Sequence, residues 1–348
     1  MLQIVDFGIT RNGQAVHRFV LSNGAGMEVE VSDFGACILA IRVPDLRGGK
    51  TDVLLGFDTL AEYEENTVNF GAFIGRNANR IANARTVIDG VTYELEANRG
   101  PHNLHSGSNK SHLKVYAARW GEDYVEFSRL SPHMEQGFPG NLTQTIRYTL
   151  TEEGTLRICY EAVSDQTTII NLTNHSHFNL SGHDSGPIYD QVLSIDADAY
   201  LPTDETLVPT GEIRAVEGTA MDLRQPKALG PVLEAADSQI RLAGGIDHNF
   251  NLRWDRTLKQ AARLHSPRSG ISMEVWTDLC GVQIYTCNLL DHRRGKGGAY
   301  YERHCGICLE TQYYPNACNE PAFPSPIFPA GTAYQSVTEY RFSTGAPL

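Results

Sequence analysis

Short segments in which apolar and polar residues alternate recur throughout the chain. Clear examples are residues 27–31, 87–95, 142–150, 156–162 and 283–286. Side chains of a β-strand point alternately to its two faces, so this period of two predicts strands with one buried face. Turns rich in glycine and proline separate the segments, which indicates hairpins in packed antiparallel sheets.

Helical patterns are few and short. Residues 58–65 and 231–239 are the best candidates, and strands do not alternate with helices as they do in a parallel α/β fold. We therefore expect an all-β protein, a large antiparallel β-sandwich with a few short helices. No break in composition and no clear internal repeat interrupts the chain, so residues 1–348 are interpreted as one domain.

Composition and charge narrow the class of function. Of the 348 residues, 41% are hydrophobic and 20% are charged, and the net charge is −12. This acidic balance disfavours a nucleic-acid partner, which normally binds a clustered basic face. The sequence does not begin with a basic segment followed by an apolar one, as a secretory signal does. No apolar run is long enough to span a membrane. We therefore expect a cytoplasmic protein with no membrane partner.

The cysteines support the same location. Seven is an odd number, which fits a reduced compartment better than a disulfide framework. Cys305 and Cys308 lie three residues apart, and in a strand they would point to opposite faces. We interpret them as buried structural cysteines.

Candidate acid/base chemistry lies in two strand-like segments. If residues 171–180 form a strand, one face carries hydrogen-bonding side chains, namely Asn171, Thr173, His175, His177 and Asn179. In residues 306–315, Glu310 stands among apolar and aromatic neighbours, which favours a raised pKa and a role as a base. His175 and Glu310 could therefore act as an acid/base pair.

The two histidines could also bind a metal, because two residues apart in a strand is an acceptable ligand spacing. A third ligand is not evident, and Glu310 and His304 are the candidates for it. Acid/base chemistry or core packing is the favoured interpretation, and we expect no metal.

Three further polar motifs admit two interpretations each. Arg76 and Arg80 could bind a sugar hydroxyl or a carboxylate, or could hold loops together by donating to backbone carbonyls. His102 and His105 could contact a ligand or lie in a surface loop. Asp247 follows a glycine turn and could bind substrate or cap an Asx-turn.

Taken together, several blocks in order resemble the aldose 1-epimerases, or galactose mutarotases. The blocks are residues 75–81 (GRNANRI), 103–107 (NLHSG), 137–140 (GFPG), 171–180 (NLTNHSHFNL), 247–250 (DHNF), and 309–315 (LETQYYP) with 319–321 (NEP). The match covers nearly the whole chain. It implies a β-sandwich of the galactose mutarotase type, with the sugar in an open cleft on one sheet.

The resemblance also implies the activity and the site. The protein would interconvert the α and β anomers of free hexoses such as glucose and galactose, by acid/base ring opening and reclosure, without a cofactor or a metal. Glu310 would be the base and His175 the acid. The residues that would bind or contact the aldohexose are Asn79, Arg80, His105, His177, Asp247 and Gln283.

The chain departs from the family's usual pattern at two positions, and other functions stay open. Ser106 stands where the family usually has Gly, and His177 where it usually has Tyr or a related aromatic residue, so substrate preference is affected. The rivals are a glycoside hydrolase that pairs Asp247 with Glu310 and a sugar-binding protein without catalysis. A sugar-phosphate epimerase would need further cations, for which Arg76 and Arg80 are the obvious candidates. Either a monomer or a homodimer is expected.

Overall fold

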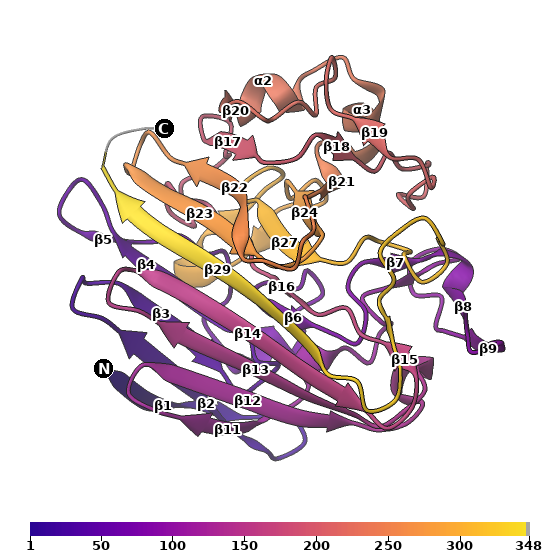
Figure 1. Ribbon diagram of the computed structural model, residues 1–348. Coiled ribbons are helices and arrows are strands. Elements are labelled where there is room, and N and C mark those ends of the chain that lie inside the picture. The colour runs from indigo at the N-terminus through magenta and orange to yellow at the C-terminus, as the bar shows by residue number, and fades with distance from the viewer. Residues whose placement is uncertain (346–348) are drawn as a thin grey trace.

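The computed structural model describes residues 1–345, and antiparallel strands dominate it (Figure 1). The largest sheet has nine strands. In spatial order these are β11 (Ala117–Trp120), β12 (Tyr124–Ser131), β13 (Leu142–Leu150), β14 (Thr155–Ser164), β29 (Tyr334–Thr344), β23 (Ile271–Thr277), β22 (Lys259–His265), β17 (Val192–Ile195) and β20 (Lys227–Ala228). The C-terminal strand β29, yellow in Figure 1, lies in the middle of this sheet between β14 and β23.

Two five-stranded sheets accompany the large one. The N-terminal sheet consists of β1 (Leu2–Ile9), β2 (Ala15–Ser22), β3 (Glu28–Ser32), β4 (Ile38–Pro44) and β5 (Lys50–Asp52). The other, in spatial order, consists of β19 (Arg214–Ala215), β18 (Ala199–Tyr200), β21 (Asp247–Asn251), β24 (Gly281–Tyr285) and β27 (Cys308–Gln312). We call this second one the site sheet, because its strands carry several of the predicted site residues.

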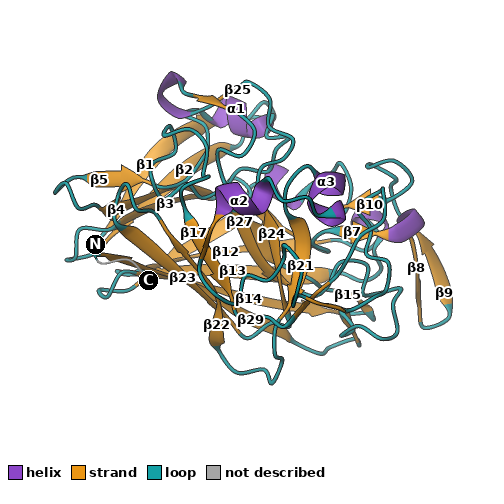
Figure 2. Cartoon of the chain, turned by 90° about the horizontal axis from the view of Figure 1, so that it is seen from above, coloured by secondary structure: helices purple, strands orange, loops and turns teal. Residues whose placement is uncertain are grey.

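Short two-stranded ladders complete the strands. They pair β10 (Asn103–Leu104) with β7 (Arg80–Ile81), β15 (Thr168–Ile169) with β28 (Ile327–Phe328), β16 (Thr173–His175) with β6 (Ala72–Ile74), β25 (Arg293–Arg294) with β26 (Tyr300–Tyr301), and β8 (Arg85–Ile88) with β9 (Val91–Glu94). Short helical turns lie in the connections around the strands (Figure 2). They are α1 (Leu60–Glu64), α2 (Leu229–Leu233) and α3 (Ser238–Ala243), with 3₁₀ turns at Ala82–Ala84, Ser111–Leu113, Glu135–Gly137 and Lys296–Gly298. Among residues 1–345, no helix is long and apolar enough to cross a membrane.

The core lies between the sheets, where the alternating pattern predicts it. Strand β13 alternates along its whole length, with every second residue from Leu142 to Leu150 buried. Ile146 of β13, Val29 of β3 and Val282 of the site sheet belong to one buried apolar cluster. The large sheet thus packs against both smaller sheets, and burial of these faces is the main source of stability.

Of three expected local elements, one is confirmed and two differ in the structure. Helix α1 is confirmed within residues 58–65, and Thr59 and Glu62 form a capping box at its start. One helix over residues 231–239 is wrong, because the chain forms α2 and α3 instead, and the carboxylate of Asp237 caps α3 by accepting from two backbone amides.

A single strand over residues 171–180 is also wrong. Strand β16 ends at His175, and the chain then changes partners: the backbone of His177 accepts from Leu55, and Phe178 pairs with Ile307. This turn keeps His177 beside His175 even though the strand does not continue.

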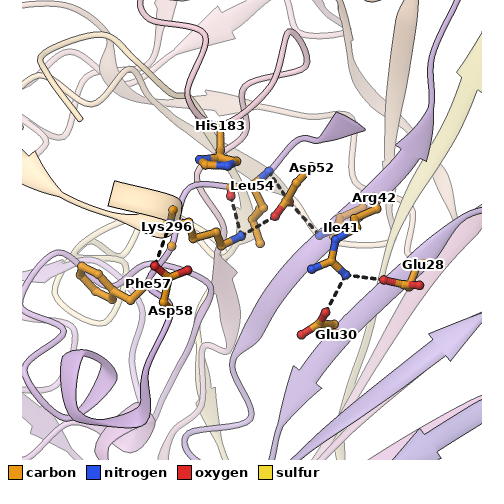
Figure 3. A network of polar contacts seen from close by, with 12 residues as sticks. Glu28, Glu30, Ile41, Arg42, Asp52, Leu54, Phe57, Asp58, His183 and Lys296 are labelled. Carbon is orange, nitrogen blue, oxygen red and sulfur yellow. Dashed lines mark hydrogen bonds and ion pairs between the residues drawn. The ribbon is translucent and has the colours of Figure 1, made fainter. Parts of the chain in front are cut away.

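A buried ion pair ties the loop around Lys296 to the N-terminal sheet (Figure 3). The Lys296 Nζ atom donates to Oδ2 of Asp52 at 2.9 Å and to the Leu54 carbonyl at 2.8 Å. Asp52 in turn accepts from the backbone of Ile41 at 3.3 Å. Burial lowers the pKa of Lys296, and the charge of Asp52 opposes that shift.

Candidate active site

A cavity of about 230 Å³ lies where the site sheet meets the loops of β7, β10 and β16. Seven of the eight predicted site residues line it, namely Asn79, Arg80, His105, His175, His177, Asp247 and Glu310. The rest of the lining is Thr67, Val68, Asn69, Arg99, Leu104, Tyr285, Leu289 and Leu290. Segments far apart in the sequence thus supply one polar site.

Glu310 reaches the cavity because strand β27 alternates between two environments. Leu309 belongs to the apolar core, whereas Glu310 points to the other face and into the cavity. Oε1 of Glu310 lies 3.6 Å from Nε2 of His175 on β16. This separation is slightly longer than a hydrogen bond, so a sugar hydroxyl could contact both groups.

Burial sets the charge of this pair. The Glu310 side chain is 2% exposed, and its Oε2 atom has no hydrogen-bond partner among the described residues. Desolvation raises the pKa of Glu310 well above 4.5, the negative charge of Asp247 adds to this, and Arg80 opposes it. Desolvation lowers the pKa of His175 to about 4. Burial therefore favours the uncharged forms of both groups, in which the pair holds one titratable proton, on the Glu310 carboxyl.

Asp247 is held from two sides. Its Oδ1 atom accepts from Nε2 of Gln283 at 2.7 Å, and its Oδ2 atom lies 3.8 Å from Nη1 of Arg80. Asp247 and Gln283 come from the neighbouring strands β21 and β24. Gln283 is buried and does not line the cavity, so it positions Asp247 from behind.

Asn79 and His105 hold each other through the backbone. His105 donates its amide to the Asn79 carbonyl, and the Asn79 amide donates to Nδ1 of His105, both at 3.1 Å. The side chain of Asn79 accepts from the amide of Arg80 at 2.8 Å. Because Nδ1 of His105 is an acceptor here, its Nε2 carries the proton when the ring is neutral.

The two departures from the family pattern lie in different environments. His177 lines the cavity, its ring centroid is 4.8 Å from that of His175, and its Nδ1 is 3.1 Å from the His175 carbonyl. Ser106 is fully buried and outside the cavity lining, and its hydroxyl contacts the backbone of Asn77 on both the amide and the carbonyl side. Ser106 therefore contacts the backbone of Asn77 and does not form part of the cavity wall.

Arg76 and His102 each admitted two interpretations from the sequence. The structure places neither residue in the cavity lining. Arg76 is fully buried and donates to carbonyl groups of residues 131, 132, 138, 139 and 140, so it holds loops together and is not a cation of the cavity. His102 accepts from the Asn83 amide at 3.0 Å and lies outside the cavity lining. Of the two arginines named as candidate cations for a sugar-phosphate epimerase, Arg80 lines the cavity and Arg76 does not.

Among residues 1–345, two buried groups of side chains have metal-ligand spacing, and both include His175. One group is His175, His177 and Cys308, and the other is His105, His175 and Glu310. Glu310, named above as a possible third ligand, is in the second group. His304, the other residue named, belongs to neither, because its ring contacts the Gly244 carbonyl at 3.0 Å and the Tyr189 hydroxyl at 3.2 Å.

Sequence reasoning missed part of the cavity wall. Tyr285 could have been found, because it stands two residues after Gln283 in an alternating segment and so shares its face. Arg99 and the pair Leu289 and Leu290 come from loops whose sequences carry no periodic signal.

Known proteins are similar to this chain over most of its length. The family model described as aldose 1-epimerase matches residues 17–341. The galactose mutarotase of Bos taurus is 44% identical over 329 residues, which cover 94% of both chains. The aldose 1-epimerase of Escherichia coli is 35% identical over 339 residues, which cover 95% of this chain and 96% of the relative.

Two solved structures share the fold over nearly the whole chain. An aldose epimerase homologue from C. elegans superposes with a TM-score of 0.87 at 28% identity, and the galactose 1-epimerase of Lactobacillus acidophilus with 0.86 at 27% identity. Each match covers 99% of both chains. The expected sandwich of the galactose mutarotase type is confirmed.

Proposed function

The chain belongs to the aldose 1-epimerase family, and we propose that it interconverts the α and β anomers of free aldohexoses such as glucose and galactose, with Glu310 as base and His175 as acid. The observation that carries the assignment is the 3.6 Å separation of Oε1 and Nε2 in a cavity of sugar size. Both groups are buried, so each can transfer a proton without competition from bulk water.

The reaction needs one proton removed and one delivered. Glu310 takes the proton of the C1 hydroxyl while His175 gives a proton to the ring oxygen, and the bond between C1 and the ring oxygen breaks to give the open aldehyde. After rotation about the C1–C2 bond, the ring closes on the other face of the aldehyde and both proton transfers reverse. Each positioned acid or base typically contributes about 10² to 10⁴ in rate.

The pair has the right number of protons for this step. Glu310 and His175 together hold one proton, and moving it from Glu310 to His175 gives the carboxylate and imidazolium that ring opening uses. A C1 hydroxyl that donates to Glu310 and a ring oxygen that accepts from His175 stabilise this charged form.

The remaining cavity residues would hold the sugar. Asp247 accepts from hydroxyl groups, Arg80 donates to them, and neutral His105 donates through Nε2. Asn79 and His177 complete the polar wall, and Gln283 keeps Asp247 in place. Holding the open aldehyde in the same position favours reclosure over escape.

The proposal extends to the setting of the enzyme. All seven cysteines are free, which is consistent with a location in the cytoplasm. The main apolar cluster draws residues from Phe19 to Phe342, which supports one domain over residues 1–348. A monomer or a homodimer would present the same cavity, because every residue of the proposed site comes from one chain.

Polarimetry on freshly dissolved α-D-glucose and α-D-galactose tests the proposal. The native protein should accelerate anomer exchange, and Glu310→Gln and His175→Asn should each reduce the enzymatic rate by about 10² to 10⁴. The matched control is Glu339→Gln, a buried glutamate on β29 that pairs with Arg157 and Arg341 outside the cavity. Circular dichroism establishes that each variant is folded.

The rival functions give different results in the same experiment. Saturable sugar binding without acceleration by the native protein would indicate a binding protein. Release of nitrophenol from nitrophenyl hexosides would indicate a glycoside hydrolase. Full activity of either variant would refute the assigned pair.

A further inference from the structure

Behind the proposed acid lies a thiol that the proposed reaction does not use. Cys308 is the first residue of β27, two positions before Glu310, and it is fully buried. Its Sγ atom lies 3.6 Å from Nδ1 of His175, on the opposite edge of the ring from Nε2, which faces Glu310. His175 thus stands between a thiol and a carboxylate.

His177 completes a group of three. One ligand atom from each of His175, His177 and Cys308 lies within 4.8 Å of the other two, and all three residues are buried. A tetrahedral zinc ion with bonds of about 2.1 Å to nitrogen and 2.3 Å to sulfur places these ligands roughly 3.5 Å apart. The contact between His175 and Cys308 already has this separation, at 3.6 Å, so the third ligand needs to approach by about 1.3 Å at most.

The surroundings of His175 resemble those of a metal-binding histidine. A metal-bound imidazole usually donates its other N–H to a carboxylate or a carbonyl, which fixes the tautomer. Coordination through Nδ1 of His175 leaves the proton on Nε2, and that atom faces Oε1 of Glu310. Glu310 would therefore serve as the carboxylate partner of the metal-bound ring.

We propose that His175, His177 and Cys308 form a site for a thiophilic divalent cation such as Zn²⁺, and that the bound cation reversibly inhibits anomer exchange. The cation forms bonds to Nδ1 of His175, to a ring nitrogen of His177 and to Sγ of Cys308. The thiol proton of Cys308 leaves to solvent, and one coordination position stays open to a small ligand. Two nitrogen ligands and one sulfur ligand favour zinc, cadmium or cobalt over magnesium or calcium.

Inhibition follows from the position of His175 and rests on the proposed function. With the metal on Nδ1, that nitrogen carries no proton, so loss of the Nε2 proton would leave an imidazolate in place of the neutral ring, and His175 no longer acts as the acid. The acid of the pair is then removed, and of the sugar-binding residues only His177 is also held by the cation.

Titration of the native protein with Co²⁺ tests the binding directly. The expected result is one equivalent bound, with intense visible bands of tetrahedral cobalt and a thiolate-to-cobalt charge-transfer band, both removed by added Zn²⁺. Cys308→Ser should lose the charge-transfer band, and His177→Phe should weaken binding by about 10-fold or more. Cys280→Ser is the matched control, because Cys280 is a buried cysteine directly before the neighbouring strand β24 and outside the group.

The alternative group of His105, His175 and Glu310 predicts a different pattern. Cobalt binding that survives Cys308→Ser without a charge-transfer band and is lost in Glu310→Gln would place the ion there and overturn the proposal. Failure of the native protein to bind Co²⁺ or Zn²⁺ would overturn it as well.

Activity with and without metal tests the inhibition. Saturating Zn²⁺ should reduce the native rate of anomer exchange by about 10² or more, and a chelator should restore it. For each variant, the rate in chelator is divided by the rate in saturating Zn²⁺. This ratio should be much smaller for Cys308→Ser than for the native protein. Binding without inhibition would refute the regulatory part. A native protein that binds Co²⁺ but is inactive in chelator would instead refute the proposed function.

Discussion

Gln283 and Glu310 are direct cross-strand partners in the ladder of β24 and β27. Their side chains therefore lie on the same face of the site sheet, and Gln283 turns its amide toward Asp247 at 2.7 Å. The negative charge of Asp247 in turn raises the pKa of Glu310. One backbone pairing thus links Asp247, the proposed substrate-binding carboxylate, to the proposed base.

Asp247→Asn should move the alkaline limb of the pH profile of kcat/KM to lower pH. The proposed pair is active while it holds one proton, between the pKa of about 4 of His175 and the raised pKa of Glu310. Removing the charge of Asp247 lowers the pKa of Glu310, so the active form is lost at a lower pH. Measurement of kcat/KM for galactose against pH, corrected for spontaneous exchange, gives the result.

The exposed Asp255 provides the control for this profile, because it lies outside the cavity lining. Asp255→Asn should leave both limbs in place. If Asp247→Asn moves the acid limb and leaves the alkaline limb unchanged, the active pair does not hold a shared proton.

Arg80→Lys should weaken substrate binding more than it slows catalysis. The guanidinium lines the cavity and approaches Asp247, and lysine cannot reproduce its planar set of donors. Loss of a charged hydrogen bond costs about 1.5 to 3 kcal/mol, so KM for glucose should rise about 10- to 100-fold. Arg85→Lys, an exposed arginine of β8, is the control, and an unchanged KM in Arg80→Lys would contradict the assignment.

Lys296→Met should destabilise the fold without a direct effect on the cavity. The substitution leaves the carboxylate of Asp52 without its cation, and breaking a buried ion pair in this way costs about 3 to 5 kcal/mol. Urea denaturation measures the free energy of unfolding. The exposed Lys50 of β5 provides the control variant Lys50→Met.

A double variant separates the lost charge from the lost packing. Asp52→Asn in the Lys296→Met background removes the unpaired carboxylate, so part of the stability should return. If the double variant is less stable than Lys296→Met alone, the penalty does not come from the unpaired charge.

Arg76→Lys should destabilise the fold strongly, although the charge is kept. Arg76 is fully buried and donates to five backbone carbonyls, and lysine has too few donors to satisfy them. Loss of several charged hydrogen bonds at about 1.5 to 3 kcal/mol each should lower the urea midpoint well below that of Arg85→Lys. Equal midpoints for the two variants would show that the loops do not depend on this side chain.

Alternation of apolar and polar residues was sufficient to predict the sandwich. The periodicity of a strand is a local property of the sequence, and every strand with one buried face shows it. Strand β13 shows this directly, since its pattern in the sequence is its pattern of burial. The run of family motifs identified His175 and Glu310 before any geometry was known. The chemistry of one carboxylate and one imidazole then indicated acid/base transfer.

Only the tertiary structure could decide which polar residues meet. Arg76 and Arg80 are four residues apart in one motif, yet one holds loops together and the other lines the cavity, because the chain turns between them. Cys308 lies against His175 for a similar reason: β16 and β27 come from distant parts of the chain. Such long-range contacts depend on how the sheets pack, and no local pattern in the sequence encodes them.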